Sequence, residues 1–439
     1  MRLAVLLISV TALAGQHAAQ EAEPASKLHA HHTHGRALRM RRGRGGKGRG
    51  GGGRGATSPL PGLNATLPQE RCKTGGRGVW DLPSHCRRKL PCDIRAFDPG
   101  ARFNRKVVQS QKKAWAKHNV DPANRHFQNG VEWWVQRGLP PAVTEPEQLR
   151  GARRVFVAAY FSYFWIFGSH LATPAARATK LKLGAAWQAQ PERFVTAHGH
   201  PGSCVQETKA TLRLVVDADH SCKDSAHPIA VPYVVSRPDW LVAARLPQAA
   251  EGEASRTTLL FFRGHLPRSY VDQGASLRGA LLRRLQGLRD PAVVMEAATS
   301  TKNASYQPHR LYLQRMLASR FCLAPRGDSA SSRRIYEAIA AGCIPVIIAD
   351  RLQLPFSRRL AWPTFSVRIT EAEALADPIG IVRKVRAIAP ERVAAMRAAL
   401  LRVRPAFLFH LDPSRPSAVD QILLDMCAGA SMTSLGGAT

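Results

Sequence analysis

The sequence predicts an α/β fold built in two halves, and three observations lead to this prediction. From about residue 90, short apolar runs alternate with helical patterns, which is typical of α/β proteins. Several of these runs contain no polar alternation, so both faces of the sheet are expected to be covered. A stretch rich in Pro, Gln, Glu and Ser at 247–255 looks like a linker between the halves. A cleft between two such halves is a common ligand site.

The composition indicates a strongly basic chain with anionic partners. The 439 residues include 63 Lys and Arg against 31 Asp and Glu, a formal net charge of +32. Nucleic acid, sugar nucleotides and acidic polysaccharides all fit this charge. Hydrophobic residues make up 45% and aromatic residues 7%. These fractions exclude a chain that is disordered throughout and a multi-pass membrane protein.

The amino terminus has the layout of a secretory signal. In residues 1–20, Arg2 precedes an apolar run that is shorter than the roughly 20 residues of a spanning helix. We expect a signal peptide, with an uncleaved signal anchor as the alternative. Sequons at Asn64 and Asn303 and the even count of 8 cysteines fit an oxidising compartment.

Residues 21–90 are expected to form a low-complexity stem with a small cysteine-containing segment. The Arg/Gly tract at 35–55 has no apolar period, so it should be disordered. Arg-Gly tracts also bind RNA in the nucleus or cytosol, which is the alternative. The histidines at 29–34 are interpreted as a solvated tract in preference to a metal site. Cys72, Cys86 and Cys92 are expected in a small disulfide-linked structure whose pairing is open.

The first half is expected at residues 91–250, with strands near 155–160, 212–216 and 229–235. The uncharged stretch 155–176 could span a membrane by length. Its Ser, Gly, His and Pro residues favour a buried strand followed by a helix start. We also expect a disulfide between Cys204 and Cys222.

Val215-Val216-Asp217-Ala218-Asp219 contains an Asp-x-Asp motif after an apolar run. Two carboxylates at this spacing can hold a divalent metal ion. The motif is short and common, and we expect chemistry without a metal.

The second half is expected at 251–410, followed by a tail at 411–439. Apolar runs predict strands at 258–262, 321–324 and 343–349. Apolar residues at helical spacing predict helices at 276–288, 312–318, 332–341 and 390–402.

The segment 319–356 predicts a strand, a short loop and a helix, followed by another strand. Pro325 breaks the first strand, and Ser329, Ser331 and Ser332 offer caps for the helix. Gly342 ends the helix. A helix amino terminus presents free N–H groups and a positive dipole end to an anion. The segment therefore predicts an anion site, although Pro345 is unusual in a central strand.

Charged residues of this helix allow two interpretations. Arg333 and Glu337 lie four residues apart and could form an exposed ion pair worth a few tenths of a kcal/mol. Alternatively, Glu337 accepts hydrogen bonds from ribose hydroxyls while Arg326 and Arg333 bind a diphosphate, which suits the forked guanidinium.

The same segment resembles the signature of the exostosin-like glycosyltransferases, glycosyltransferase family 47. The matches occur in one order over the segment: Phe321-Cys322-Leu323, Pro325, Gly327-Asp328, Ser331-Ser332-Arg333, Glu337-Ala338-Ile339, Gly342-Cys343-Ile344-Pro345-Val346-Ile347 and Leu354-Pro355-Phe356. Weaker similarity extends over about 90–410. It includes the segments Val231-Pro232-Tyr233, Leu259-Leu260-Phe261-Phe262-Arg263-Gly264 and 362–369.

The resemblance implies two Rossmann-like domains facing across a cleft, the arrangement called GT-B. It implies inverting transfer of a sugar from a nucleoside-diphosphate donor to a glycan or polysaccharide in the Golgi lumen. No cofactor, metal or nucleic acid is expected, and a homologous glycosyltransferase subunit is a possible partner. The residues expected to bind the donor are Arg263, Arg326, Asp328, Ser331, Ser332, Arg333 and Glu337.

A general base must take the proton of the attacking hydroxyl. The candidates are His198, His200 and a carboxylate that the sequence does not place. The family often has a His-Asp pair before Gly-x-Cys, whereas this chain keeps Gly202 and Cys204 but lacks the Asp. This departure motivates the alternative of a catalytically inactive lectin-like or scaffold protein.

Overall fold

The structure is a computed structural model that describes residues 90–104, 130–166, 170–219, 221–235, 255–265, 277–298, 309–327, 329–410 and 415–429. The predictions for the leader, the stem, both sequons, Cys72, Cys86, Asp328 and nearly all of the 247–255 linker lie outside these residues.

The first sheet contains five parallel strands in the order β1-β2-β3-β4-β5. Its strands are β1 (Ile94–Phe97), β2 (Arg154–Val157), β3 (Phe194–His198), β4 (Leu212–Val215) and β5 (His227–Ala230). In register, Phe97 lies beside Val157, and His198 lies beside Val215. Because every strand runs in the same direction, their carboxyl ends form one edge. The loops that follow β2, β3 and β4 all leave from this edge.

Helices cover both faces of the first sheet. The helices of this half are α2 (Val131–Arg137), α3 (Phe161–Ile166) and α4 (Ala172–Ala189), which bends at Gly184. Strand residues alternate between two buried clusters. Ile94 and Phe156 pack with the residues of α2, while Phe97 and Val157 pack with those of α4. The prediction of a buried strand followed by a helix start at 155–176 is confirmed. Among the described residues, no helix has both the length and the apolar character needed to cross a membrane.

The second sheet also has five parallel strands, in the order β10-β9-β8-β6-β7. Its strands are β6 (Thr258–His265), β7 (Val293–Ala298), β8 (Ser319–Pro325), β9 (Ile344–Ile348) and β10 (Val367–Arg368). From β6, the chain first builds outward to β7 and then returns to add β8 on the other side. The strand order therefore reverses between β6 and β8. Ligands of open α/β sheets bind outside the carboxyl ends of the strands at such a reversal.

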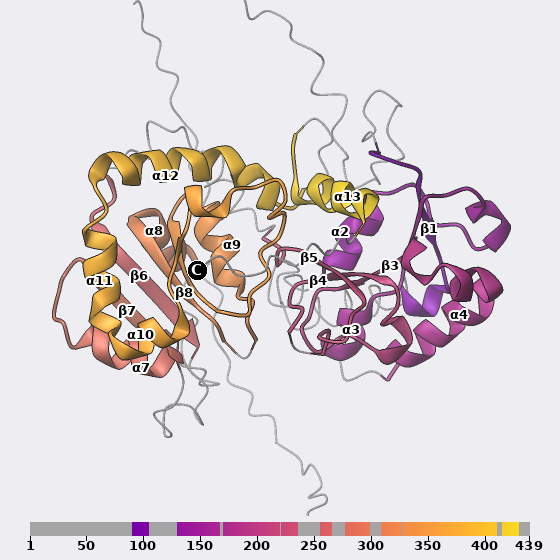
Figure 1. Cartoon of the computed structure of the whole chain (residues 1–439), viewed down its shortest axis with the longest axis horizontal. Coiled ribbons are helices and arrows are strands. Elements are labelled where there is room, and N and C mark those ends of the chain that lie inside the picture. Colours follow the sequence, from indigo (N-terminus) through magenta and orange to yellow (C-terminus); the bar gives the residue numbers. More distant parts are fainter. Residues whose placement is uncertain are drawn as a thin grey trace, which may run out of the picture. The chain divides into compact units, whose positions relative to one another are not determined.

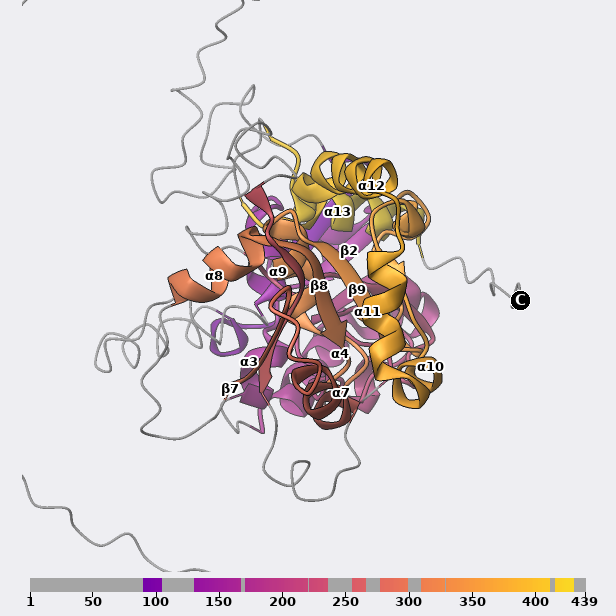
Figure 2. The same cartoon turned by 90° about the vertical axis from the view of Figure 1, so that its left-hand side faces the viewer.

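The helices of the second half lie on both faces of its sheet. They are α7 (Leu277–Gln286), α8 (His309–Leu317), α9 (Arg333–Ala340), α10 (Glu371–Ala376), α11 (Pro378–Arg386) and α12 (Pro390–Val403). Helices α7, α10 and α11 contact one another. Figure 2 shows α10 and α11 on the opposite side of β8 from α8 and α9. All predicted strands and helices of this half are confirmed, with ends that shift by up to three residues.

Pro345 is accommodated in β9 because the strand has few neighbours there. On one side Pro345 lies beside Cys322 of β8. On the other side, pairing with β10 begins only at Val346, so the missing N–H of Pro345 breaks no ladder with β10.

The last helix returns to the first half of the chain. Helix α13 (Ala418–Ala428) begins with a capping box between Ser417 and Asp420 and packs against α2. Figure 1 shows α13 in yellow beside the magenta α2. This helix lies within 411–439, where the sequence predicted only a tail.

Three disulfides occur among the described residues. Cys204–Cys222 confirms its prediction, and Cys322–Cys343 joins β8 to the residue before β9. Cys92 pairs with Cys427, 335 residues away. The expectation of a local bond for Cys92 is therefore wrong, because α13 brings a distant cysteine to it.

Candidate functional site

The candidate site lies at the carboxyl ends of β6 and β8, where the strand order of the second sheet reverses. Arg263 stands near the end of β6, and Arg326 follows β8 directly. The loop from Arg326 leads to α9, whose amino terminus presents backbone N–H groups. A sheet reversal, two of the predicted arginines and a helix amino terminus thus occur together, an arrangement that suits an anion.

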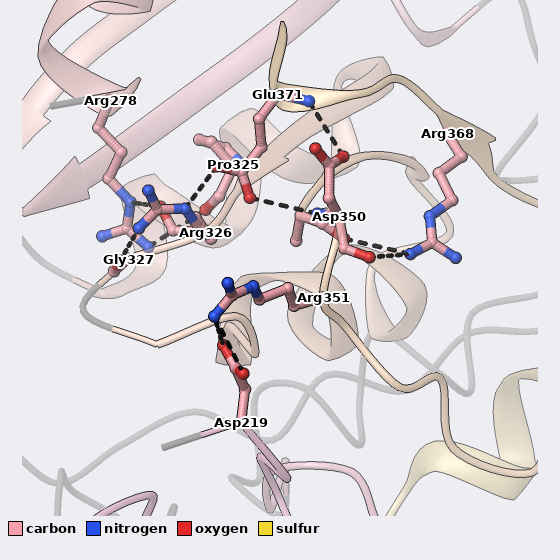
Figure 3. A network of polar contacts seen from close by, with 10 residues as sticks. Asp219, Arg278, Pro325, Arg326, Gly327, Asp350, Arg351, Arg368 and Glu371 are labelled. Carbon is pink, nitrogen blue, oxygen red and sulfur yellow. Dashed lines mark hydrogen bonds and ion pairs between the residues drawn. The ribbon is translucent and has the colours of Figure 1, made fainter. Parts of the chain in front are cut away.

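Arg326 belongs to a polar network that joins the loops after β8 and β9 (Figure 3). Its Nε donates to Glu371 Oε2 at 2.7 Å, and its side chain is 44% exposed. Glu371 also accepts from the backbone N–H of Asp350 at 3.2 Å. Arg278 of α7 donates to the carbonyl oxygen of Arg326 at 2.9 Å. Glu371 therefore holds Arg326 in place while leaving nearly half of its surface in solvent.

Gly327 has a specific steric role in this loop. A Cβ placed on Gly327 would lie 2.7 Å from Nη2 of Arg278. Any other residue would therefore push Arg278 away from the loop.

Arg263 is held between two charged neighbours. Its guanidinium lies 3.7 Å from Glu296 of β7, which also pairs with Arg315. The carbonyl oxygen of Arg263 accepts from Arg334 of α9, whose guanidinium lies 4.6 Å from the centre of the Phe262 ring. A cluster of three arginines and one carboxylate thus surrounds the end of β6.

Ser331 and Ser332 lead into α9. Ser332 occupies the N-cap position with extended backbone, but its hydroxyl makes no cap hydrogen bond. The backbone N–H of Ser331 donates to Asp217 Oδ2 at 2.6 Å. Asp217 follows β4 of the first sheet and is only 4% exposed. A carboxylate that follows a strand of the first sheet thus accepts a hydrogen bond from the backbone just before α9.

The Asp-x-Asp motif joins the two sheet edges. The second oxygen of Asp217 accepts from the backbone N–H of Asp219 at 2.8 Å, which shapes the turn. Asp219 in turn lies 3.4 Å from Arg351, which follows β9 (Figure 3). Within the described ranges, no group of three or more His, Cys, Asp and Glu gathers around a common point. Both aspartates here contact the second half of the chain.

Arg333 and Glu337 form the ion pair that their spacing predicts, with 3.1 Å between Nε and Oε1. The pair is largely buried, with side chains 17% and 12% exposed, so the interpretation as an exposed pair is wrong. Glu337 Oε2 accepts from the Tyr312 hydroxyl at 2.9 Å. Burial is the main cause that raises the pKa of Tyr312, and the nearby charge of Glu337 adds to it. The hydroxyl therefore stays protonated and donates its hydrogen bond to Glu337. Both oxygens of Glu337 are thus fixed in orientation.

His198 lies inside the protein as the last residue of β3. Its side chain is fully buried, with one ring nitrogen 3.1 Å from the Ser203 carbonyl and the other 3.1 Å from Thr196 Oγ1. Burial, reinforced by the charge of Arg213, lowers the pKa of His198 to about 3. The ring is therefore neutral at physiological pH, and both of its nitrogens are engaged within the protein.

His200 lies in the loop after β3 and is partly exposed. Its Nδ1 accepts from the backbone N–H of Gly202 at 3.0 Å. A neutral ring with this bond carries its proton on Nε2. Of the two predicted histidines, only His200 is partly exposed to solvent.

A buried carboxyl group that the sequence did not single out lies nearby. Glu132 of α2 is fully buried, and its Oε1 accepts from the backbone N–H of Ser162 at 2.8 Å. Burial raises its pKa to about 7, and the hydrogen bond to Ser162 opposes this shift. Glu132 therefore anchors the start of α3, which follows β2 at the same edge.

The sequence missed the residues that support the predicted arginines. Arg278 and Glu371 lie outside the signature segment, and Arg334 lies inside it but matches none of its motif positions. Gly264 and Gly327 were a usable signal, since an added Cβ on either glycine would lie within 3.0 Å of an arginine. A glycine near the end of a strand can thus indicate that a long side chain from another element lies against the backbone at that position.

The described site defines a class of protein: an α/β protein that presents cationic side chains and backbone N–H groups at a sheet reversal. Residues 203–385 match the family described as the Exostosin GT47 domain. These residues are therefore similar to that domain, and the resemblance found in the signature segment is confirmed.

Proteins similar to this chain are named as glycosyltransferases. "Probable arabinosyltransferase ARAD1" of Arabidopsis thaliana is 30% identical over 156 residues, or 36% of this chain and 33% of that protein. A "Probable glucuronosyltransferase" of Oryza sativa subsp. japonica is 31% identical over 163 residues, covering 36% and 34%. "Exostosin-1 homolog" of Caenorhabditis elegans is 34% identical over 97 residues, covering 22% and 24%.

The matched region is limited in extent. The chain spans about a third of the length of the two plant relatives. Among solved structures, a glycosyltransferase from Rickettsia africae covers 76% of this chain and 98% of its own, with 12% identity and a TM-score of 0.33.

Proposed function

We propose that the protein is a glycosyltransferase that moves a sugar from a nucleoside-diphosphate donor onto a glycan or polysaccharide acceptor. The single observation that carries this proposal is the cationic sheet reversal at Arg263 and Arg326, which lies inside the exostosin domain. The relatives named as arabinosyl- and glucuronosyltransferases support the reaction class.

The donor diphosphate is proposed to lie between Arg326 and the amino terminus of α9. Arg326 is the most exposed of the three predicted arginines, at 44% against 19% for Arg263 and 17% for Arg333. It can bind phosphate while Glu371 still orients it. Glu337 is proposed to accept a ribose hydroxyl, since Arg333 and Tyr312 fix its oxygens. Asp328 and Ser332 complete the proposed set.

The proposed reaction is inverting and needs no metal. An acceptor hydroxyl oxygen bonds to the anomeric carbon as the bond from that carbon to the diphosphate oxygen breaks. The cations and N–H groups stabilise the leaving diphosphate. His200 is the candidate base, with the acceptor hydroxyl replacing Gly202 N–H at Nδ1 and giving its proton there. His198 is proposed to hold the loop after β3 in position.

The secretory pathway, with the Golgi lumen as the expected site, is proposed as the location. Every cysteine in the described part of the chain is disulfide-bonded, and such bonds persist in oxidising compartments.

Calorimetry with uridine and guanosine diphosphates tests the donor site. We expect Arg326→Ala and Glu337→Ala to weaken binding about tenfold or more, since a charge-assisted contact contributes about 1.5–3 kcal/mol. Arg383→Ala is the matched control, because Arg383 is an exposed arginine on α11 that is ion-paired with Asp377.

Unchanged affinity in both site variants would mean that the donor site is wrong. Sugar-nucleotide hydrolysis with and without EDTA tests catalysis. Turnover abolished by EDTA would contradict the metal-independent reaction, and nucleotide binding without any turnover would favour the lectin-like alternative.

A further inference from the structure

Trp165 is an exposed aromatic side chain at the carboxyl edge of the first sheet. It lies in α3, which follows β2, and its relative exposure is 55%. The other exposed large hydrophobic side chains in the described part of the chain are leucines. Burial of an indole removes about 150–250 Å² of surface from water, so leaving it half exposed forfeits a sizeable stabilisation.

The indole is supported by the loop after β3. A Cβ placed on Gly202 would lie 2.5 Å from Cε2 and 2.6 Å from Cζ2 of Trp165, so the ring lies directly against the Gly202 backbone. The ring of His200 lies 5.8 Å from the indole, centre to centre, at 31° between planes. Trp165 is therefore a supported ring with about half of its surface open.

This ring is connected to the proposed donor half through two loops. Pro201 accepts from the Ser221 hydroxyl at 2.5 Å, and Cys204–Cys222 bonds the loop after β3 to the loop after β4. The loop after β4 carries Asp217 and Asp219, which contact Ser331 and Arg351. An acceptor resting on Trp165 would thus lie on the first half, at the edge that meets the donor half.

We propose that Trp165 is the platform on which a sugar ring of the acceptor stacks, an inference that rests on the proposed function. One face of a pyranose carries C–H groups of partial positive charge, which meet the negative face of the indole. His200, beside the indole, carries its proton on Nε2 and can donate to a sugar oxygen. Gly202 is part of the platform because any side chain there would displace the ring.

An immobilised panel of neutral and acidic oligosaccharides, probed with the intact protein without donor, tests the proposal. Trp165→Ala should reduce glycan binding about two- to tenfold, and Trp165→Phe less, since aromatic contacts of this kind contribute about 0.5–1.5 kcal/mol. Gly202→Ala should also reduce binding, because the added Cβ displaces the indole while Trp165 itself is retained. Leu181→Ala is the control, because Leu181 is 82% exposed on α4 of the same half.

Glycan binding that survives Trp165→Ala, or the absence of any glycan bound by the unaltered protein, would overturn the platform. Calorimetry with uridine and guanosine diphosphates separates this result from the donor site. Trp165→Ala should leave nucleotide affinity unchanged. If Trp165→Ala loses glycan binding and the unaltered protein binds neither nucleotide, the platform is supported and the donor site is refuted.

Discussion

Two buried titratable side chains respond to pH in opposite directions. Burial raises the pKa of Glu132 from 4.5 to about 7, so the folded protein holds a proton that the unfolded chain has lost. This contribution to stability is lost as pH rises through that window. Burial also lowers the pKa of His198 from 6.5 to about 3, so the unfolded chain binds a proton that the folded protein does not. This second contribution is lost as pH falls.

The unaltered protein should lose unfolding free energy between pH 4.5 and 7 because Glu132 ionises, and Glu132→Gln should not. The difference in unfolding free energy should therefore shift in favour of Glu132→Gln as pH rises from 4.5 to 7. The expected gain is about 3 kcal/mol, because one pKa unit corresponds to about 1.4 kcal/mol. Urea unfolding at several pH values measures it. Glu147→Gln removes an exposed carboxylate as the control. A difference between Glu132→Gln and the unaltered protein that stays constant with pH would contradict the assignment.

At the scale of elements, α13 stabilises the first half although it comes last in the sequence. Its apolar face, with Ile422 fully buried, packs with α2 in one continuous cluster. The carbonyl oxygen of Met426 accepts from Arg154 Nε at 2.7 Å, at the start of β2. The helix therefore contacts both α2 and the start of β2.

Ile422→Ala should cost about 2–5 kcal/mol of unfolding free energy, because it leaves a cavity between α13 and α2. Leu424→Ala, on the same helix but 39% exposed, should cost less than about 1 kcal/mol. Denaturant midpoints compare the two variants. Equal midpoints for both would show that α13 does not belong to the cooperative core.

The strands that the sequence predicted have mostly apolar residues. A strand whose apolar run is interrupted by polar residues was missed. Strand β3 was missed because Thr196 and His198 interrupt its apolar run, yet these side chains bond to each other within the sheet. Helix α13 carries a capping signal in Ser417 and Asp420, but its packing partner lies about 280 residues earlier. The Arg333–Glu337 pair was predicted because its partners lie four residues apart, whereas the pairing of Arg326 with Glu371 depends on a tertiary contact.

At the scale of the whole molecule, Asp217 and Asp219 in the turn after β4 connect the carboxyl edges of the two sheets. The carboxylate of Asp217 is buried against Ser331 N–H, whereas Asp219 meets Arg351 in a pair exposed to 37% and 77%. A buried charge-assisted hydrogen bond stabilises more than an exposed ion pair. Asp217 should therefore carry most of the energy of this contact.

Asp217→Ala should destabilise the protein by about 1–3 kcal/mol, because the N–H groups of Ser331 and Asp219 lose their acceptor. Asp219→Ala should cost about 0–1 kcal/mol. Thermal unfolding of both variants provides the comparison. A larger loss in Asp219→Ala than in Asp217→Ala would contradict the assignment.

The bond between Cys92 and Cys427 gives the backbone the topology of a closed ring. A protease that cuts once anywhere between these two residues opens the ring without releasing a fragment. On a non-reducing gel such a nicked protein keeps the mass of the intact one, and reductant alone reveals the cut. A molecule of this kind tolerates a single cleavage in a surface loop, because both pieces stay covalently attached and at high local concentration.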